Sequence, residues 1–308
     1  MAPSLRIGCI WYAPPAFMVT ILIPAKNEES AITGTVQRIQ KVMSDAGISG
    51  YEILVINDGS SDRTGELAKA AGARVVTHPH NAGYGRSLKH GIRQATHDTI
   101  CITDADLTYP AEAIPSLLKE YERGNDMVVG QRTGEHYRES ALKAPLRRVL
   151  QWLVEYAAGR RVPDANSGLR IFSQKTILEH LPHLCDTFSF TTSMTIAYML
   201  TGKFVTYVPI SYEARVGRTH VKLLKDSLRT LLYICQSVMY YAPLKIFLLL
   251  AGFSLFGGLA CWGIGQILKL AGKEMQIWYI LGIVGVVLSV VVFLLGLLAD
   301  VLKQILLK

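Results

Sequence analysis

Two carboxylates separated by one residue are the first sign of chemistry in this sequence. Asp104 and Asp106 flank Ala105 directly after the apolar residues 99–103. Acids at this spacing can share a hard divalent cation, because Mg²⁺ or Mn²⁺ prefers oxygen ligands and binds through one or two carboxylates together with substrate phosphates. Such an ion would neutralise a diphosphate while its bond to carbon breaks. A loop whose acids only cap the next helix is the alternative, and the position after a buried strand favours the metal site.

Three further segments could form a nucleotide site. Asp58 follows an apolar run and could accept hydrogen bonds from a base or ribose, although an Asx-type turn would explain it as well. Residues 24–28 offer either a wall for a nucleotide or a plain helix start. Gly83 and Gly85 open a helix and would let backbone amides approach a phosphate. A dinucleotide fingerprint would have its third glycine where Leu88 stands, so a dehydrogenase is disfavoured.

A cluster of basic residues precedes the apolar C-terminal part of the chain. Arg215, Arg218, His220 and Lys222 lie close together in the sequence. Such clusters recognise phosphate, and they also touch anionic lipid beside a membrane; both roles can hold together. The formal net charge is +8. Because the basic residues gather beside the apolar part and form no groove-reading motif, we expect no nucleic-acid partner.

Short apolar runs alternate with helical patterns in the first half of the chain. This alternation predicts parallel strands with right-handed crossovers in an open α/β sheet. Ligands of such sheets lie beyond the carboxyl ends of the strands, so residues 24–28, 57–60, 78–85 and 104–108 should face one shared cleft. The expected strands are residues 19–23, 52–56, 74–77, 99–103 and 127–129, and the expected helices are residues 28–46, 62–71, 85–96 and 110–123.

Two runs without charge predict membrane-spanning helices. Residues 246–268 and 275–299 would each form a helix of roughly 35 Å, longer than the roughly 30 Å hydrocarbon core of a bilayer. Lys and Arg residues flank the two runs on the outside, and only Lys269 and Lys273 lie between them. The positive-inside rule therefore places the N-terminal domain and the C-terminus in the cytoplasm. We expect an integral protein of a cytoplasmic or endoplasmic-reticulum-type membrane.

Two amphipathic segments could lie at the membrane surface. Residues 146–161 and 221–241 combine basic with aromatic and aliphatic residues, which suits a helix in the headgroup layer; ordinary packing on the sheet is the alternative. The resulting division is a catalytic domain at residues 1–225, an interfacial helix at 226–243 and a transmembrane hairpin at 244–308. The five cysteines show no CxxC spacing, so neither a zinc site nor a set of structural disulfides is expected.

Taken as an ordered set, these motifs resemble the family 2 glycosyltransferases. Within that family the polyprenyl-phosphate branch is the more similar one, typified by dolichyl-phosphate mannose synthase and the bacterial polyisoprenyl-phosphate glucosyltransferases. The motifs are residues 21–28 (Ile-Leu-Ile-Pro-Ala-Lys-Asn-Glu), 55–62 (Val-Ile-Asn-Asp-Gly-Ser-Ser-Asp), 104–110 (Asp-Ala-Asp-Leu-Thr-Tyr-Pro), 167–170 (Ser-Gly-Leu-Arg) and 215–220 (Arg-Val-Gly-Arg-Thr-His).

The resemblance implies a GT-A fold and a role for each matching residue. Asp104 and Asp106 would bind Mg²⁺ or Mn²⁺ and the diphosphate, and Arg132 would lie near the sugar or diphosphate. The catalytic set that the resemblance implies is Asp104, Asp106, Arg132 and Arg215. The nucleotide-binding set is Pro24, Ala25, Asn27, Glu28, Asp58, Gly83, Asp104 and Ala105, and the set for the acceptor phosphate is Arg147, Arg215, Arg218, Thr219 and His220.

The reaction that these residues predict is an inverting transfer of one hexosyl unit. The donor would be a UDP- or GDP-linked sugar, and the acceptor a dolichyl- or undecaprenyl-type phosphate at the cytoplasmic face of the bilayer. A processive polysaccharide synthase is one alternative, but the Gln-x-x-Arg-Trp segment of those enzymes is absent from the sequence. A membrane-anchored nucleotide-sugar sensor or scaffold without turnover is the other. The sequence leaves the sugar, the base, the prenol length and a homo-oligomeric state open.

Overall fold

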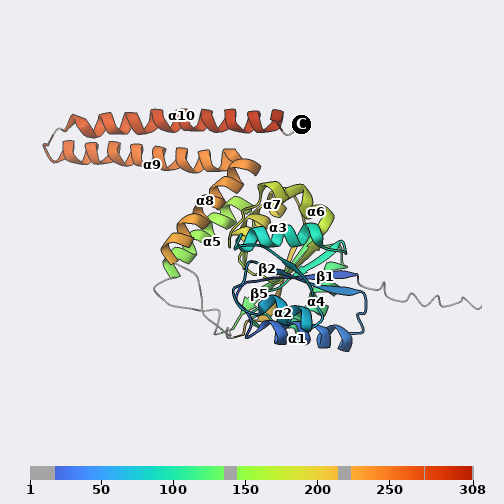
Figure 1. The fold of residues 1–308 in the computed structure, drawn as a ribbon. Coiled ribbons are helices and arrows are strands. Elements are labelled where there is room, and N and C mark those ends of the chain that lie inside the picture. Colours follow the sequence, from blue (N-terminus) through green and yellow to red (C-terminus); the bar gives the residue numbers. More distant parts are fainter. Residues whose placement is uncertain (1–17, 135–143, 214–222, 274, 307–308) are drawn as a thin grey trace, which may run out of the picture.

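The structure is a computed structural model, and it describes residues 18–134, 144–213, 223–273 and 275–306. Its centre is one sheet with the strand order β3-β2-β1-β4-β6-β5-β7 (Figure 1). Every strand runs in the same direction except β6, which pairs antiparallel with β4 and β5. The strands are β1 Val19–Ala25, β2 Tyr51–Asn57, β3 Arg74–Thr77, β4 Thr99–Ile102, β5 Met127–Thr133, β6 Arg170–Ser173 and β7 Val205–Ser211.

Helices cover both faces of this sheet, because successive side chains of a buried strand point to opposite sides. Ile21 and Ile23 of β1 pack in one apolar cluster with α1 Ile32–Asp45, α2 Thr64–Ala70 and α4 Ile114–Tyr121. Leu22 packs in a second cluster, on the other face, with α3 Tyr84–Gln94, α6 Gln174–His180 and α7 Phe190–Leu200. Two short 3₁₀ helices, η1 Ala111–Ala113 and η4 Leu181–His183, precede α4 and follow α6. All seven residues of β1 are buried, as expected for a central strand covered on both sides.

The sheet differs from the prediction in its second half. The five strands expected up to residue 129 are present, and β5 extends to Thr133. However, β6 is inserted between β4 and β5, so the sheet is mixed and not purely parallel. The insertion is anchored by Arg170, a fully buried residue whose guanidinium donates to the carbonyl oxygens of Ser167 and Thr191. A buried arginine gives no apolar pattern, which is why this strand is invisible to a search for hydrophobic runs.

A third apolar cluster joins two long helices to the edge of the domain. Val154 and Ala157 of α5 Ala144–Ala158 meet Ile234 and Val238 of α8 Leu223–Tyr241, together with Ile196 of α7. These helices correspond to the two segments predicted to be amphipathic. Both pack on α7, and α8 leads directly into the C-terminal hairpin (Figure 1).

The C-terminal hairpin consists of α9 Pro243–Leu270 and α10 Gln276–Leu306. Each helix is long and apolar enough to cross a membrane. The two are packed very closely where glycines face each other: a Cβ built on Gly285 would lie 2.6 Å from the Cα of Gly258. Nearby, the Ser254 hydroxyl donates to the carbonyl of Gly285 at 2.9 Å. The two predicted helices are therefore present as a tight antiparallel pair.

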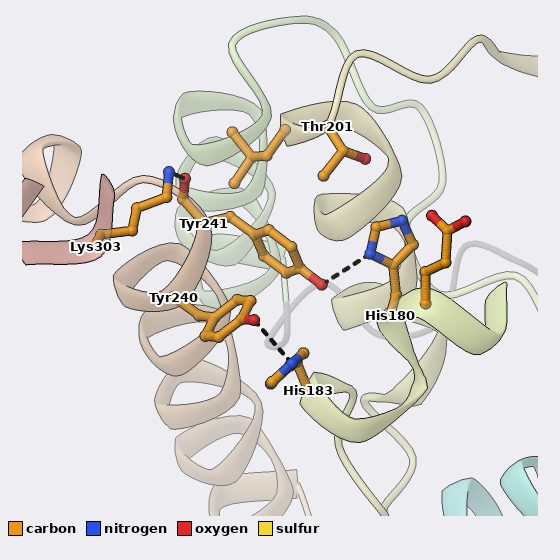
Figure 2. A pocket seen from close by; sticks show the side chains of 8 residues that line it. His180, His183, Thr201, Tyr240, Tyr241 and Lys303 are labelled. Carbon is orange, nitrogen blue, oxygen red and sulfur yellow. Dashed lines mark hydrogen bonds between the residues drawn. The ribbon is translucent and has the colours of Figure 1, made fainter. Parts of the chain in front are cut away.

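A small pocket of about 260 Å³ lies where this hairpin meets the domain (Figure 2). The Tyr240 hydroxyl is 2.8 Å from Nε2 of His183, and the Tyr241 hydroxyl is 3.2 Å from Nδ1 of His180. The Lys303 ammonium donates to the carbonyl of Tyr241. These contacts tie the end of α8 to α6 and η4, and α10 to the end of α8, so they connect the hairpin to the domain.

Candidate functional site

The loops after β1 and β2 are joined to each other by hydrogen bonds. The amide of Asn27 donates to the Ser60 hydroxyl at 3.0 Å, and its side-chain oxygen accepts from the Ser61 amide at 2.9 Å. Asn27 itself has a φ of 54°, in the left-handed region that asparagine tolerates better than most residues. The amide of Glu28 donates to the Thr64 hydroxyl at 2.8 Å. The first two predicted nucleotide segments therefore form one connected surface at the carboxyl edge of the sheet.

Asp58 connects this surface to the loop after β3. Its carboxylate accepts hydrogen bonds from the amides of Ala82 at 2.7 Å and Gly83 at 2.9 Å, and it lies 2.8 Å from Nδ1 of His78. Burial by itself would raise the pKa of Asp58, but these three contacts outweigh it and hold the pKa below its usual value. The other ring nitrogen of His78 lies 2.8 Å from His90. In this structure Asp58 and the Gly83 amide therefore shape the loop after β3, and their contact with a nucleotide stays a prediction.

The paired acids follow β4 and differ in their surroundings. Asp106 is buried, and one of its oxygens accepts hydrogen bonds from the amide and the hydroxyl of Thr108, the latter at 2.6 Å. Between them Leu107 has a φ of 61°, a conformation that costs energy for a side chain of this size. Asp104 is less buried and accepts a hydrogen bond from the Tyr84 hydroxyl at 3.1 Å. Tyr84, the first residue of α3, thus joins the start of that helix to the loop after β4.

The backbone of Gly168 lies close to the Asp104 carboxylate. A Cβ built on Gly168 would lie 3.1 Å from both carboxylate oxygens of Asp104 and 3.2 Å from the Tyr109 ring. The Gly168 amide donates to the Tyr109 hydroxyl at 2.6 Å, which holds the backbone in this position. A larger residue at the glycine of the Ser-Gly-Leu-Arg motif would therefore press on the Asp104 carboxylate.

The donor atoms at this edge suit a hard cation that keeps part of its shell for a substrate. Among the described residues, no group of three or more His, Cys, Asp or Glu side chains could hold a metal on its own. Asp104 and Asp106 supply carboxylate oxygens only. This set matches Mg²⁺ or Mn²⁺ bound jointly by one or two carboxylates and phosphate oxygens, and it does not match a closed structural site.

Arg132 lies at the end of β5 in a bidentate pair with Asp164. Its Nε and Nη2 atoms are each 2.8 Å from a carboxylate oxygen of Asp164, which is almost fully buried. The guanidinium carbon also lies 5.4 Å from the centre of the Tyr212 ring. This arrangement fixes the guanidinium in one orientation. Its predicted place near the sugar or diphosphate stays a prediction.

Gly85, in the first turn of α3, has a packing role that the sequence did not reveal. A Cβ on Gly85 would lie 2.6 Å from the backbone of Cys185 and Asp186, so no side chain fits there. The same segment is held by Lys89, whose ammonium is 2.6 Å from the Asp186 carboxylate. Gly85 is therefore required for the contact between the start of α3 and residues 185–187, and this contact explains the second glycine without a phosphate.

Part of the predicted acceptor site lies outside the described residues. Arg215, Arg218, Thr219 and His220 belong to residues 214–222, which the structure does not describe. Arg147 lies in α5, and only its backbone is described. The acceptor site therefore stays a prediction from the sequence.

Comparison with known proteins decides the family. Residues 20–190, more than half of the chain, match the family described as Glycosyl transferase family 2. The chain belongs to this glycosyltransferase family. Its resemblance to the family, drawn from the ordered motifs, is confirmed.

Several curated relatives share this glycosyltransferase domain. The low-salt glycan biosynthesis hexosyltransferase Agl6 of Haloferax volcanii is 27% identical over 73% of this chain and 55% of its own length. An undecaprenyl-phosphate 4-deoxy-4-formamido-L-arabinose transferase of Klebsiella pneumoniae is 31% identical over 53% of this chain and 51% of its own length. The protein of that name from Yersinia enterocolitica is 27% identical over 77% of this chain and 74% of its own length. The alignments thus span about half the length of the first two relatives.

Solved structures confirm the GT-A fold. Glucosyl-3-phosphoglycerate synthase from Mycobacterium tuberculosis, in complex with phosphoglyceric acid, superposes with a TM-score of 0.59 over 72% of this chain and 80% of that one, at 20% identity. The same enzyme with Mn²⁺, UDP-glucose and phosphoglyceric acid gives a TM-score of 0.58 over 74% of this chain and 86% of that one, at 19% identity. At these identities the likeness establishes the fold alone.

Three contacts of the candidate site were not predicted. Tyr84 lies against Asp104, His78 against Asp58, and Asp164 against Arg132. His78 and Tyr84 lie within residues 78–85, which were predicted to face the cleft, but no partner was predicted for either. All three contacts join segments distant in the chain, so only the folded sheet reveals them.

Proposed function

We propose that this chain transfers a single hexosyl unit from a UDP- or GDP-linked sugar to a polyprenyl phosphate, with inversion at the anomeric carbon. The observation that carries the proposal is the position of Asp104 and Asp106 at the carboxyl edge of the sheet, in a chain with two helices able to cross a membrane. The names of the Klebsiella and Yersinia relatives support a lipid-linked phosphate as the acceptor. Membership of the family supports the transfer itself.

The donor would lie along the loops after β1, β2 and β4. Pro24, Ala25, Asn27 and Glu28 form the wall nearest the base and ribose, next to the segment that begins at Asp58. The hydrogen bonds between these loops hold the wall before any donor arrives, so little ordering is needed on binding. Asp104 and Ala105 border the same edge, and the diphosphate would lie beside Asp104, where a side chain at Gly168 would crowd the carboxylate.

Asp104 and Asp106 would hold Mg²⁺ or Mn²⁺ together with the diphosphate. When bound, this ion supplies positive charge that stabilises the departing diphosphate. The protein contributes orientation: Thr108 fixes the Asp106 carboxylate, and Tyr84 fixes that of Asp104. The solved Mycobacterium tuberculosis enzyme with the same fold contains Mn²⁺ and UDP-glucose, which supports this choice of ion.

The acceptor phosphate needs no protein base. A phosphate monoester carries roughly −1.5 to −2 charge near pH 7, so its oxygen is already an adequate nucleophile. What the protein must supply is position and positive charge, which we assign to Arg132 and Arg215 beside the sugar and to Arg147, Arg218, Thr219 and His220 around the acceptor. Arg132, held by Asp164, has the fixed geometry that such a role needs.

Membrane insertion of α9 and α10 would bring the site to the bilayer surface. Basic residues outside the hairpin favour a cytoplasmic location for the domain. The exposed side chains of α8 include Leu232 and Met239, and those of α5 include Trp152, which would lie in the headgroup layer. A lipid-borne phosphate could then reach the sheet edge without leaving the membrane.

The test is a transfer assay with the purified full chain in detergent. UDP- and GDP-sugars carrying a labelled hexose are each offered with Mn²⁺ and with polyprenyl phosphate, the corresponding polyprenol or no acceptor. The proposal predicts chloroform-soluble label with at least one donor, and only with the phosphate. Label transferred equally to the free alcohol, or none with any donor, would overturn it.

A further inference from the structure

We propose that Tyr84 is the residue that positions the Asp104 carboxylate for the metal and the diphosphate. The inference rests on the proposed function, because it assigns Asp104 to that role. It adds a residue from a different loop to the metal-binding machinery. Tyr84 would not touch the metal; it would act through Asp104.

The first evidence is the contact itself. The Tyr84 hydroxyl donates to one oxygen of Asp104 at 3.1 Å, a full hydrogen bond between side chains from the loops after β3 and β4. A tyrosine hydroxyl is protonated at neutral pH, so it can only act as the donor toward a carboxylate. A donor on one carboxylate oxygen restricts rotation of the carboxylate, and this sets the directions of its remaining lone pairs.

The second evidence is that the Tyr84 ring packs against another aromatic ring. It stacks on Phe188, with ring centres 5.5 Å apart and planes 16° from parallel. Phe188 is 60% exposed, so burial in a core does not account for its place there. The segment that carries Phe188 is fixed on α3 by the Lys89–Asp186 ion pair at 2.6 Å and by the Arg86 amide, which donates to the Asp186 carbonyl at 3.2 Å.

Gly168 also lies close to the Asp104 carboxylate. Any side chain at Gly168 would begin 3.1 Å from both carboxylate oxygens. The backbone of the Ser-Gly-Leu-Arg motif and the Tyr84 hydroxyl therefore both limit how the carboxylate can turn. A carboxylate oriented by a hydrogen-bonding neighbour is the arrangement expected of a metal ligand supported by an outer partner.

Removal of the hydroxyl alone tests the idea. Tyr84→Phe keeps the ring and its stacking on Phe188 but deletes the hydrogen bond. We expect Mn²⁺ binding in the presence of UDP, followed by the electron paramagnetic resonance signal of free Mn²⁺, to weaken about tenfold. The unfolding temperature should stay within about 2 °C of the wild type, because one partly exposed hydrogen bond is lost. Tyr51→Phe, at the opposite end of β2, is the matched control and should leave Mn²⁺ binding unchanged.

A double variant separates a positioning role from a general loss of packing. In the Asp104→Asn background, Tyr84→Phe should weaken Mn²⁺ binding no further, because the two residues act as one unit. An undiminished tenfold loss in that background, or an unchanged affinity in Tyr84→Phe alone, would overturn the role of Tyr84 and leave the transfer reaction intact. Normal Mn²⁺ binding in a wild type that forms no lipid-linked sugar would overturn the proposed function only. Absence of Mn²⁺ binding in the wild type would overturn both.

Discussion

Asp104 and Asp106 show how neighbouring residues of one type come to differ in their surroundings. Asp106 is buried and bonded to Thr108 within its own loop, whereas Asp104 reaches across to Tyr84 and faces Gly168. The sequence predicted the pair and its position after a strand. It could not predict Tyr84, because a hydroxyl that reaches a carboxylate from a different loop leaves no local pattern. Residue types were therefore predictable here, and their partners were not.

Gly85 offers a test of the packing beside the site. Gly85→Ala would place a methyl group 2.6 Å from the backbone of residues 185 and 186, which cannot yield as a flexible side chain could. We expect it to destabilise the protein by about 1–3 kcal/mol, seen as a lower unfolding temperature. Gly34→Ala in α1 is the control, since its nearest neighbour would be a Leu107 methyl group at 3.6 Å. Equal stability of the two variants would show that residues 185–187 do not press on α3.

Asp58 makes stability depend on pH. Its pKa is held below the usual value in the folded state, so the carboxylate contributes stability above about pH 4, the pKa of an unfolded aspartate. That contribution is lost as the pH falls through the folded pKa. We expect Asp58→Asn to be about 1–3 kcal/mol less stable than the wild type at pH 7, and the difference to shrink progressively below about pH 4. Thermal unfolding from pH 7 to pH 3 measures this.

The control for that series is Asp45→Asn at the exposed end of α1. It should follow the wild type at every pH. A difference between wild type and Asp58→Asn that is constant from pH 7 to pH 3 would show that the three hydrogen bonds to Asp58 do not favour its charged form.

The elements of the first half of the sheet were predictable because each shows a clear local signal. Residues 19–25 and 51–57 are apolar and largely buried, and helices α1, α2 and α3 each start within four residues of the predicted positions. The second half was not predictable in this way. Strand β6 is only four residues long and begins with the buried Arg170, and α7 is buried over most of its length although it contains three threonines. Their places depend on hydrogen bonds and packing from distant segments.

The helix α8 provides a test of the membrane surface. Leu232 is 64% exposed and Met239 41% exposed, with the exposed Cys235 between them, while Ile234 and Val238 are buried against α5 and α7. If this exposed face lies in the headgroup layer, a fluorophore on Cys235, with the other four cysteines replaced by Ala, should be quenched by brominated lipids and shielded from aqueous iodide.

The matching control carries the same fluorophore at an exposed position on α4, introduced as Ser116→Cys in a background without Cys235. It should respond to iodide and not to brominated lipid. Identical quenching at the two positions would show that α8 lies in water and that the membrane contact is confined to the hairpin.

The whole molecule combines a hydrogen-bonded sheet edge with an apolar C-terminal hairpin joined to it by defined contacts. Helices α5 and α8 share an apolar cluster with α7, and Tyr240, Tyr241 and Lys303 attach the hairpin to the domain (Figure 2). The same helix α7 follows directly on the segment that holds Tyr84. Composition and apolar runs predicted the two parts of the molecule. The contacts between them could be found only in three dimensions, because they pair aromatic and histidine side chains far apart in the sequence.

The most direct measurement compares wild type and Asp106→Asn in the transfer of labelled hexose to polyprenyl phosphate. With Mn²⁺, the wild type should form chloroform-soluble product, and addition of a chelator should abolish it. Asp106→Asn should keep its unfolding temperature within a few degrees, because an amide oxygen can still accept from Thr108, yet lose at least about a hundredfold in rate. Asp45→Asn should match the wild type. Full activity of Asp106→Asn, or product formation unaffected by the chelator, would contradict the account.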